Sequence, residues 1–320
     1  MAGPPTLQGV EAATDRIRGV LRSTPILTST VLDRRAGVSL ALKAENLQVT
    51  GAFKVRGALA AMTVEAVGSR SLVTASAGNF GQGVAFAAAA AGRQALVVVP
   101  EGAPRNKVER IRRLGGTVRS LGCDYDASEA LARDLARREG LPFLPPFDHP
   151  RVIEGQGTAV LELLREVPEL DALVVPCGGG GLLAGAIVAA ESVPRPPRVV
   201  AAEPVAIPSL SAALERGEPD RIALRPTVAD GVAVRRIGKA PWAVVRRRLA
   251  GVVRVSESAI IEAIALLALE TKQVVEGAGA VALAAALTRP RELTGCRRVG
   301  VLVTGGNIDP GTLARLLAPP

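Results

Sequence analysis

Short runs of valine, leucine and alanine recur along the chain, separated by longer stretches whose apolar residues follow a helical spacing. Such short apolar runs, bounded by glycine, proline or polar residues, are typical of buried strands. Strands that alternate with helices predict an α/β fold with a mostly parallel sheet covered by helices on both faces. The pattern predicts strands at residues 39–44, 72–75, 95–99, 117–121, 172–175, 198–202 and 298–303.

Composition supports this architecture. Hydrophobic residues make up 48% of the 320 residues, but Phe, Tyr and Trp together only 2%, so the cores consist mainly of alanine, valine and leucine. A chain of this length allows two domains of about 100 to 200 residues each. A proline-rich piece at 144–150 interrupts the alternation, and we expect the chain to cross between domains there.

Three glycine-rich loops each follow a predicted strand and precede a helical stretch. They span residues 76–83, 177–182 and 304–307. In an open parallel sheet, ligands bind at the carboxyl ends of strands, where such loops supply backbone amides. We therefore expect the three loops to contribute to one ligand site.

The loop with four consecutive glycines exposes backbone N–H groups at a helix start, which is how proteins hold phosphate. It lacks the lysine of a P-loop, and no acidic residue follows at the spacing of a dinucleotide-binding motif. A flexible turn or tight helix packing is the alternative explanation. The expected phosphate donors are the amides of Gly178, Gly179, Gly180, Gly181 and Leu182.

Lys54 stands between two glycine turns in the segment 50–57, at an expected loop-to-helix junction. An amine becomes nucleophilic at neutral pH when its surroundings lower its pKa, and the apolar flank together with the cation Arg56 acts in that direction. The segment alone fits a surface lysine at a helix start better than a nucleophile. We single out Lys54 as a candidate nucleophile.

Two of these loops carry candidate polar side chains, namely Ser76 and Asn79 in one and Thr304 in the other. The Asn79 amide can donate to a phenolate-like oxygen, and the Ser76 hydroxyl with neighbouring amides can bind a carboxylate. Asn79 could instead cap the following helix, and Thr304 could simply bond to a neighbouring carbonyl. The residues themselves leave these alternatives open.

The remaining composition excludes several classes of protein. The net charge is +9, but the arginines are dispersed and no aromatic residues alternate with them, so we expect no nucleic-acid partner. The single histidine, His149, rules out a multi-histidine metal site, and we expect it to have a loop role. Three cysteines and no apolar leader or span favour a reducing cytoplasm and no membrane contact.

Taken in order, the motifs resemble the threonine and serine dehydratases (ammonia-lyases) of the fold-type II pyridoxal-phosphate enzymes, a group related to serine racemase. The likeness covers nearly the whole chain. It rests on residues 45–48 with the Lys54 segment, the loop from Ser76, 146–150, 155–158, the tetraglycine, 202–204, 229–231, 275–279 and 304–307.

The resemblance implies two open twisted, mostly parallel sheets with helices on both faces, as in the tryptophan synthase β-like fold. It implies a large cofactor-binding domain of residues 1–70 and 148–320, and a small mobile domain of residues 71–147 that carries the substrate-carboxylate loop. It also implies a homodimer.

The resemblance further assigns the site. Lys54 is the catalytic lysine that forms a Schiff base with pyridoxal 5′-phosphate. The cofactor would also be held by Phe53 beside the ring, Asn79 at the 3-hydroxyl oxygen, the amides of Gly178 to Leu182 at the phosphate, and Thr304 at the ring nitrogen. The substrate carboxylate would lie against Ser76, Ala77, Gly78, Asn79, Phe80 and Gly81.

The implied reaction is β-elimination of water from an L-hydroxyamino acid of the threonine or serine type, which gives a 2-oxo acid and ammonia. A neutral hydroxyl at Thr304, where other families place an aspartate, favours rapid loss of a β-leaving group. The alternatives are a serine racemase-like or β-replacement enzyme on the same scaffold, and a catalytically idle protein that binds the cofactor.

Three departures from the family pattern bear on these alternatives. Phe80 replaces the usual histidine, which admits a bulkier or more apolar β-substituent, such as that of phenylserine. Ala77 replaces the serine that acts as the second base of serine racemase, so racemisation is disfavoured. The racemase's cation site would fall at Glu203, Ile207 and Ser209, where one carboxylate remains, and we expect no metal.

Overall fold

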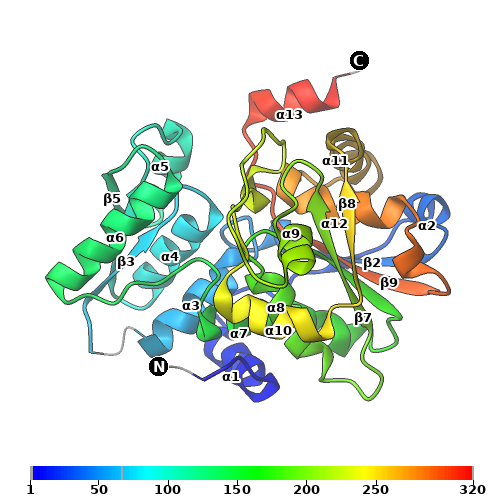
Figure 1. The fold of residues 1–320 in the computed structure, drawn as a ribbon, viewed down its shortest axis with the longest axis horizontal. Coiled ribbons are helices and arrows are strands. Elements are labelled where there is room, and N and C mark those ends of the chain that lie inside the picture. Colours follow the sequence, from blue (N-terminus) through cyan, green and yellow to red (C-terminus); the bar gives the residue numbers. More distant parts are fainter. Residues whose placement is uncertain (1–2, 66–67, 319–320) are drawn as a thin grey trace.

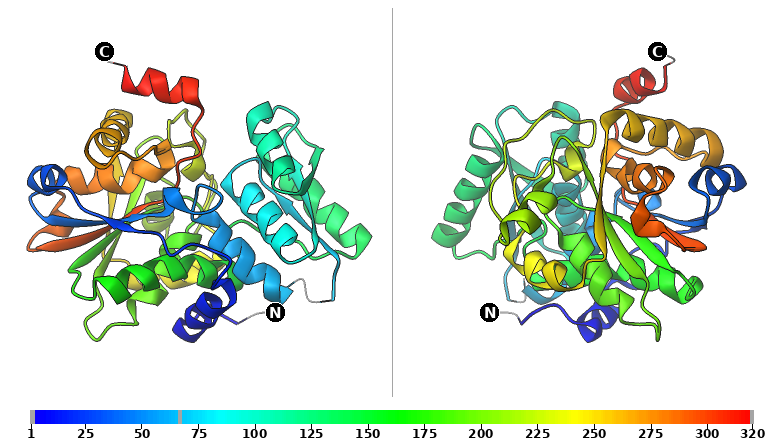
Figure 2. Two further views of the ribbon diagram at one scale, coloured as in Figure 1. Left: turned by 180° about the vertical axis from the view of Figure 1, so that it is seen from behind. Right: turned by 45° about the vertical axis from the view of Figure 1, so that its right-hand side comes forward.

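The computed structural model describes residues 3–65 and 68–318. The strands form two separate sheets, and Figures 1 and 2 show them side by side, each with its own helices. The larger sheet has the order β1-β2-β9-β6-β7-β8 and is parallel except for β1; the smaller sheet is parallel, with the order β3-β4-β5. The strands are β1 (Ile26–Leu27), β2 (Ser39–Ala44), β3 (Ser71–Ala75), β4 (Gln94–Val99), β5 (Gly116–Ser120), β6 (Ala172–Pro176), β7 (Arg198–Pro204), β8 (Gly251–Val255) and β9 (Arg298–Val303).

All the strands that the hydrophobic pattern predicts are present, most of them displaced by no more than one or two residues at an end. The prediction missed β1 and β8. A two-residue strand such as β1 has no periodicity to detect, and it pairs antiparallel at the sheet edge. β8 is the opposite edge strand and carries the exposed Arg254, so its sequence lacks the continuous apolar run of a central strand.

Helices cover both faces of each sheet. Alternate residues along a strand enter opposite cores, as a period of two requires: Leu40 and Leu42 pack with α2, α11 and α12, whereas Ala41 packs with α7 and α8. The helices are α1 (Leu7–Ile17), α2 (Thr30–Ala36), α3 (Lys54–Glu65), α4 (Asn79–Ala90), α5 (Arg105–Arg113), α6 (Tyr125–Glu139), α7 (Pro150–Glu166), α8 (Gly181–Ala190), α9 (Ser209–Arg216), α10 (Lys239–Arg248), α11 (Glu257–Thr271), α12 (Gly277–Leu287) and α13 (Pro310–Leu317), with 3₁₀ turns at η1 (Glu45–Leu47), η2 (Asp230–Val232) and η3 (Arg291–Leu293).

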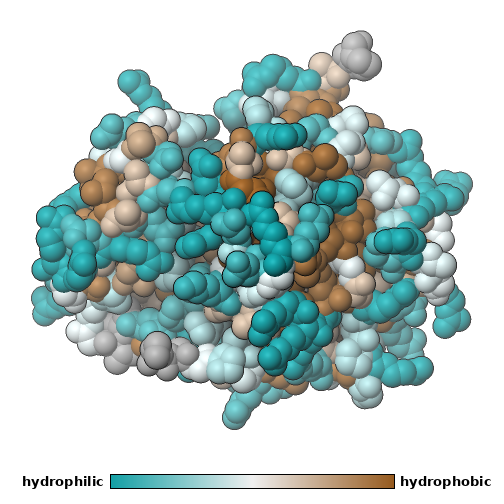
Figure 3. All heavy atoms as spheres, in the orientation of Figure 1, coloured by the Kyte–Doolittle hydropathy of each residue, from teal (hydrophilic) through white to brown (hydrophobic). Residues whose placement is uncertain are grey.

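The smaller sheet has the same layered construction. Val97 lies in the core shared with α3 and α4, and Val98 lies in the core shared with α6. The face of the molecule shown in Figure 3 is largely hydrophilic, with a limited band of apolar atoms near the centre of the view. The two sheets agree with the expectation of two domains, and the boundaries at 70/71 and 147/148 stay a prediction.

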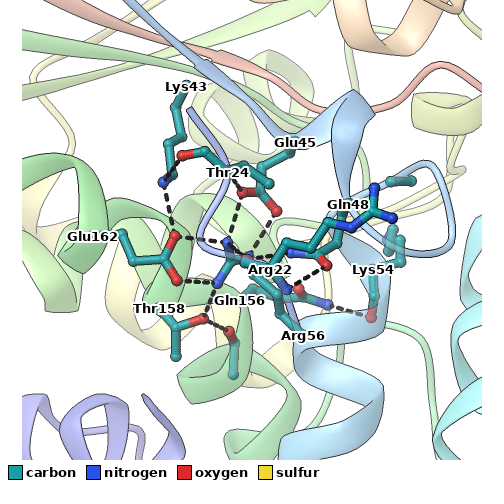
Figure 4. A network of polar contacts seen from close by, with 12 residues as sticks. Arg22, Thr24, Lys43, Glu45, Gln48, Lys54, Arg56, Gln156, Thr158 and Glu162 are labelled. Carbon is teal, nitrogen blue, oxygen red and sulfur yellow. Dashed lines mark hydrogen bonds and ion pairs between the residues drawn. The ribbon is translucent and has the colours of Figure 1, made fainter. Parts of the chain in front are cut away.

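A buried ionic network fixes α3 to the larger sheet (Figure 4). The guanidinium of Arg56, which is fully buried, donates through Nε and Nη2 to Glu45 at 2.7 and 2.8 Å. It also donates through Nη1 and Nη2 to Glu162 of α7 at 2.7 and 2.8 Å. Lys43 of β2 donates to the same Glu162 at 2.7 Å. The network pairs two cations with two carboxylates, which is the condition under which buried charges are tolerated.

Glycines bring α3 and α7 into close contact beside this network. A Cβ at Gly155 would lie 2.6 Å from the Cα of Gly57, and a Cβ at Gly57 would lie 2.7 Å from the backbone oxygen of Val152. No side chain fits at either position. The first turn of α3, which begins with Lys54, is therefore held against a fixed helix.

Replacing Arg56 with methionine should unfold the protein more easily. The change leaves Glu45 and Glu162 buried with Lys43 as their only remaining cation in the network, and breaking a buried pair costs about 3–5 kcal/mol. The free energy of unfolding from urea titration measures this. Arg18→Met is the control, because the exposed Arg18–Asp15 pair should contribute less than about 1 kcal/mol. Equal losses in the two variants would contradict a structural role for the network.

Candidate active site

A cavity of about 390 Å³ lies between the two sheets and brings together residues far apart in the sequence. Its walls include every residue singled out for the site except Gly81, where an added Cβ would meet the Ser76 backbone oxygen and the Val97 side chain. The three glycine-rich loops contribute as expected from the carboxyl ends of their strands: β3 leads to the Ser76 loop, β6 to the tetraglycine and β9 to Thr304. The prediction that these loops meet is confirmed.

Lys54 is the first residue of α3, and two backbone contacts fix its position. Phe53 N donates to Thr304 O at 3.0 Å, and Gly306 N donates to Gly51 O at 2.9 Å. Ala52 and Gly305 form an antiparallel bridge between these contacts. The lysine segment is thus paired with the loop after β9, which is why Lys54 and Thr304 share one cavity.

Burial lowers the pKa of Lys54 to about 8, and the negative charge of Glu276 opposes this shift. The sequence-based argument named the wrong second cause. Arg56 does not lower this pKa, because its guanidinium points away from the cavity and is neutralised by Glu45 and Glu162. At a pKa of about 8, a useful fraction of the amine is neutral near neutral pH. The Lys54 Nζ lies 5.1 Å from the centroid of the Phe53 ring.

The tetraglycine supplies unpaired donors. None of the amides from 178 to 182 donates to a protein acceptor within the described residues. Gly180 has a φ of +86°, a left-handed conformation that suits glycine, and α8 begins immediately after it. A Cβ at Gly179 would lie 2.4 Å from the Phe147 ring. The loop is a cradle of N–H groups at a helix N-terminus, which suits a phosphate.

The Ser76 loop forms a second set of donors. Ser76 Oγ accepts from Gly78 N at 3.2 Å, which shapes the turn into α4. The amides of Ala77, Asn79, Phe80 and Gly81 donate to no protein acceptor in the described part of the chain. Free amides at the start of a twelve-residue helix can hold a carboxylate.

Phe80, at the start of α4, is largely buried. It is only 2% exposed and belongs to the apolar core of the smaller sheet, with Val97 and Ile111. Phe80 also lines the cavity, so it contributes to the core and to the wall. Its part in substrate choice stays a prediction.

Thr304, His149 and Glu203 each contact other parts of the protein, and the expected contact of Thr304 with a ring nitrogen stays a prediction. Thr304 Oγ1 donates to Ala278 O at 3.2 Å, and the residue lines the cavity as well. His149 occupies the N-cap position of α7, 3.8 Å from Glu65 and away from the cavity wall. Glu203 caps α9, because its two oxygens accept from the amides of Leu210 and Ser211 at 2.9 and 3.0 Å.

The sequence argument gave no role to Glu276 and Asn307, which both contact Asn79. Glu276 Oε1 accepts from Asn79 Nδ2 at 2.7 Å, and Asn307 Nδ2 donates to Asn79 Oδ1 at 2.8 Å. Asn79 is therefore not a helix cap; that position belongs to Gly78. Glu276 and Asn307 both stand in motifs that carry the family resemblance. A polar residue next to a glycine in each motif was the sequence signal that could have identified them.

Replacing Gly179 with alanine should weaken binding of the expected cofactor by at least about tenfold, the effect of losing one good hydrogen bond. The added Cβ would collide with the Phe147 ring and displace the amides of the cradle. Titration of the cofactor-free protein with pyridoxal phosphate gives the dissociation constant. Gly102→Ala is the control, since nothing lies within 4 Å of its Cβ position. Unchanged affinity in Gly179→Ala would argue against the cradle.

The chain is similar to known proteins over almost its whole length. A family model described as pyridoxal-phosphate dependent enzyme matches residues 17–305. The L-threonine ammonia-lyase of Thermotoga maritima is 38% identical over 98% of this chain and 78% of the relative. The L-threo-3-hydroxyaspartate ammonia-lyase of Saccharomyces cerevisiae is 36% identical over 98% of this chain and 97% of the relative. The crystal structure of serine racemase from Dictyostelium discoideum has a TM-score of 0.90 at 35% identity and covers 95% of this chain and 99% of that one.

These similarities confirm three expectations: the fold-type II architecture, the ammonia-lyase type of enzyme and the dependence on pyridoxal phosphate. They also agree with the site, where a buried lysine and a glycine cradle lie in one cavity. The chain therefore belongs to the pyridoxal-phosphate-dependent enzymes, in the group that contains the threonine ammonia-lyases and serine racemases.

Proposed function

We propose that this chain is an ammonia-lyase that eliminates water from an L-hydroxyamino acid of the threonine or serine type and releases a 2-oxo acid and ammonia. One observation carries the proposal: an amine of lowered pKa shares a cavity with two separate sets of unpaired backbone donors. One set suits a phosphate and the other a carboxylate. A phosphorylated aldehyde cofactor and an amino-acid substrate together need these three elements.

The residues present fit pyridoxal phosphate. The amides of Gly178 to Leu182 would hold the phosphate, where added side chains would fill the cradle. Lys54 would bind the aldehyde carbon, Asn79 the phenolic oxygen and Thr304 the ring nitrogen, with Phe53 beside the ring. When bound, the cofactor supplies an electron-withdrawing ring conjugated to the substrate's amino nitrogen.

The chain's own groups perform the remaining tasks. The free amides of the Ser76 loop orient the substrate carboxylate, which places the α-hydrogen toward Lys54. The neutral Lys54 amine takes the α-proton, the electron pair of that bond forms the double bond between the α- and β-carbons, and the β-hydroxyl leaves. Later hydrolysis at the amino-bearing carbon gives the 2-oxo acid and ammonia.

Racemisation is the second candidate, because the similar proteins include serine racemases. It needs a proton donor on the face of the α-carbon opposite Lys54. Ala77 lines the cavity and has no group that transfers a proton. This supports elimination as the main reaction.

We also propose that residues 71–147 close over the substrate as a small domain on the remainder of the chain. Ion pairs already cross the cavity mouth: Lys107 of α5 lies 2.6 Å from Asp230, and Asp126 of α6 lies 2.8 Å from Arg221. Both pairs are partly exposed, and such pairs contribute about 1 kcal/mol or less. They can therefore open and re-form at little cost as the domain moves.

We propose that the protein is a homodimer and that it is located in the cytoplasm. The location rests on three free thiols, Cys123, Cys177 and Cys296, which suit a reducing compartment. Leu269 and Val274, at 63% and 53% exposure, leave apolar surface for a second copy. Among the described residues, no helix has the length and apolar character needed to cross a membrane. Sedimentation velocity of the purified protein tests the dimer.

Lys54→Ala should reduce 2-oxo acid release by about a thousandfold or more, because the variant loses both the Schiff-base amine and the α-proton acceptor. The assay uses L-serine, L-threonine, L-threo-3-hydroxyaspartate and phenylserine, with chiral analysis of the remaining amino acid. Lys239→Ala is the control, an exposed lysine at the start of α10. We expect 2-oxo acid from at least one substrate and little D-enantiomer. Equal rates in Lys54→Ala and wild type would refute the mechanism, and D-enantiomer without 2-oxo acid would favour the racemase.

A further inference from the structure

Three side chains form a hydrogen-bonded network beside the cavity, from Glu276 through Asn79 to Asn307, and the first two of them line it. The distances are 2.7 Å from Asn79 Nδ2 to Glu276 Oε1 and 2.8 Å from Asn307 Nδ2 to Asn79 Oδ1. Asn307 Nδ2 also donates to the backbone oxygen of Thr50 at 2.8 Å. This network of hydrogen bonds thus begins at Glu276, the N-cap of α12, and ends on the segment that carries Lys54.

The acceptors at the two ends of the network, Thr50 O and the Glu276 carboxylate, determine the orientation of the two amides between them. A backbone carbonyl only accepts, so Thr50 fixes the NH₂ group of Asn307 toward itself and toward Asn79. An ionised carboxylate also only accepts, so Glu276 fixes the NH₂ group of Asn79 on its own side. Flipping either amide would set two acceptors against each other. The orientation therefore follows from the network and not from Asn79 alone.

One hydrogen of Asn79 remains. Its NH₂ group has two hydrogens, and Glu276 takes one; the other has no protein acceptor among the described residues, while Asn79 lines the cavity. We infer that Glu276 and Asn307 are positioning residues that commit Asn79 to present a donor, never an acceptor, to the phenolic oxygen of the cofactor. This inference rests on the proposed function. A donor at this place favours the form of the cofactor in which the phenolic oxygen is negatively charged.

The electrostatic surroundings of Glu276 agree with this role. Burial and the nearby Asp230 raise the pKa of Glu276 to about 7, and the bond from Asn79 with the positive charges of Lys107 and Lys54 opposes the rise. Above this pKa Glu276 is an acceptor only, and the orientation of Asn79 is fixed. Below it the carboxyl carries a proton and can donate as well as accept, so it no longer dictates which side of the Asn79 amide faces it.

The sharpest test exchanges donors and acceptors at the two ends of this hydrogen-bond network. In the double variant Glu276→Gln with Asn307→Asp, Asp at 307 accepts from Asn79 and Gln at 276 donates to it, so Asn79 turns and presents its carbonyl to the cavity. The phenolic oxygen of the bound cofactor should then hold its proton to higher pH. Spectrophotometric pH titration of the bound cofactor should show a rise in its apparent pKa of at least about one unit, which corresponds to the loss of one hydrogen bond.

Single variants separate orientation from simple structural support. Glu276→Gln alone keeps an acceptor, and Asn307 still sets Asn79, so we expect a smaller spectral change than in the double variant. Asn307→Asp alone places acceptors opposite Thr50 and Asn79, so we expect cofactor affinity to fall by about tenfold or more. Circular dichroism establishes that each variant is folded.

The outcomes distinguish this inference from the proposed function. A wild-type protein that forms no Schiff-base absorbance with pyridoxal phosphate overturns the proposed function and the inference with it. A wild type that binds, together with a folded double variant whose cofactor titrates as in wild type, overturns the inference alone. A raised apparent pKa in the double variant, larger than in Glu276→Gln, supports it.

Discussion

The buried pairing of Arg56 with Glu45 and Glu162 is the interaction on which the site depends. A guanidinium without contact to water is tolerated only when its donors and charge are matched, and here the nitrogens of Arg56 meet the two carboxylates that lie on η1 and α7. This requirement allows one position for the first turn of α3. Lys54 is the first residue of that turn. The pairing of Arg56 with Glu45 and Glu162 therefore also positions the Lys54 amine.

The second constraint is the set of donors that the fold leaves unpaired. Backbone amides at the tetraglycine and at the Ser76 loop have no protein acceptor within the described residues, although buried amides are almost always paired. Such groups cost free energy until a ligand accepts from them. The tetraglycine follows β6 of the larger sheet and the Ser76 loop follows β3 of the smaller one, so the two sets of donors reach the cavity from different sheets.

Burial also adjusts the chemistry inside the cavity. The same low polarity lowers the pKa of Lys54 to about 8 and raises that of Glu276 to about 7, so both groups change charge near neutral pH. Their mutual attraction acts against both shifts. Part of the Lys54 population is therefore neutral near neutral pH, and Glu276 accepts a hydrogen bond from Asn79 in the same cavity.

The sequence by itself determined the α/β class, the central strands and the three loops, because glycine after an apolar run has a local meaning that does not require the fold. It also placed Lys54, Asn79 and Thr304 in one site through the order of their motifs. It missed β1 and β8, because these edge strands lack a continuous apolar run. Only the tertiary structure decided the hydrogen-bond partners of Asn79 and the pairing of the Arg56 guanidinium with Glu45 and Glu162. Hydrogen bonds between residues about two hundred positions apart in the chain depend on distances that no local pattern records.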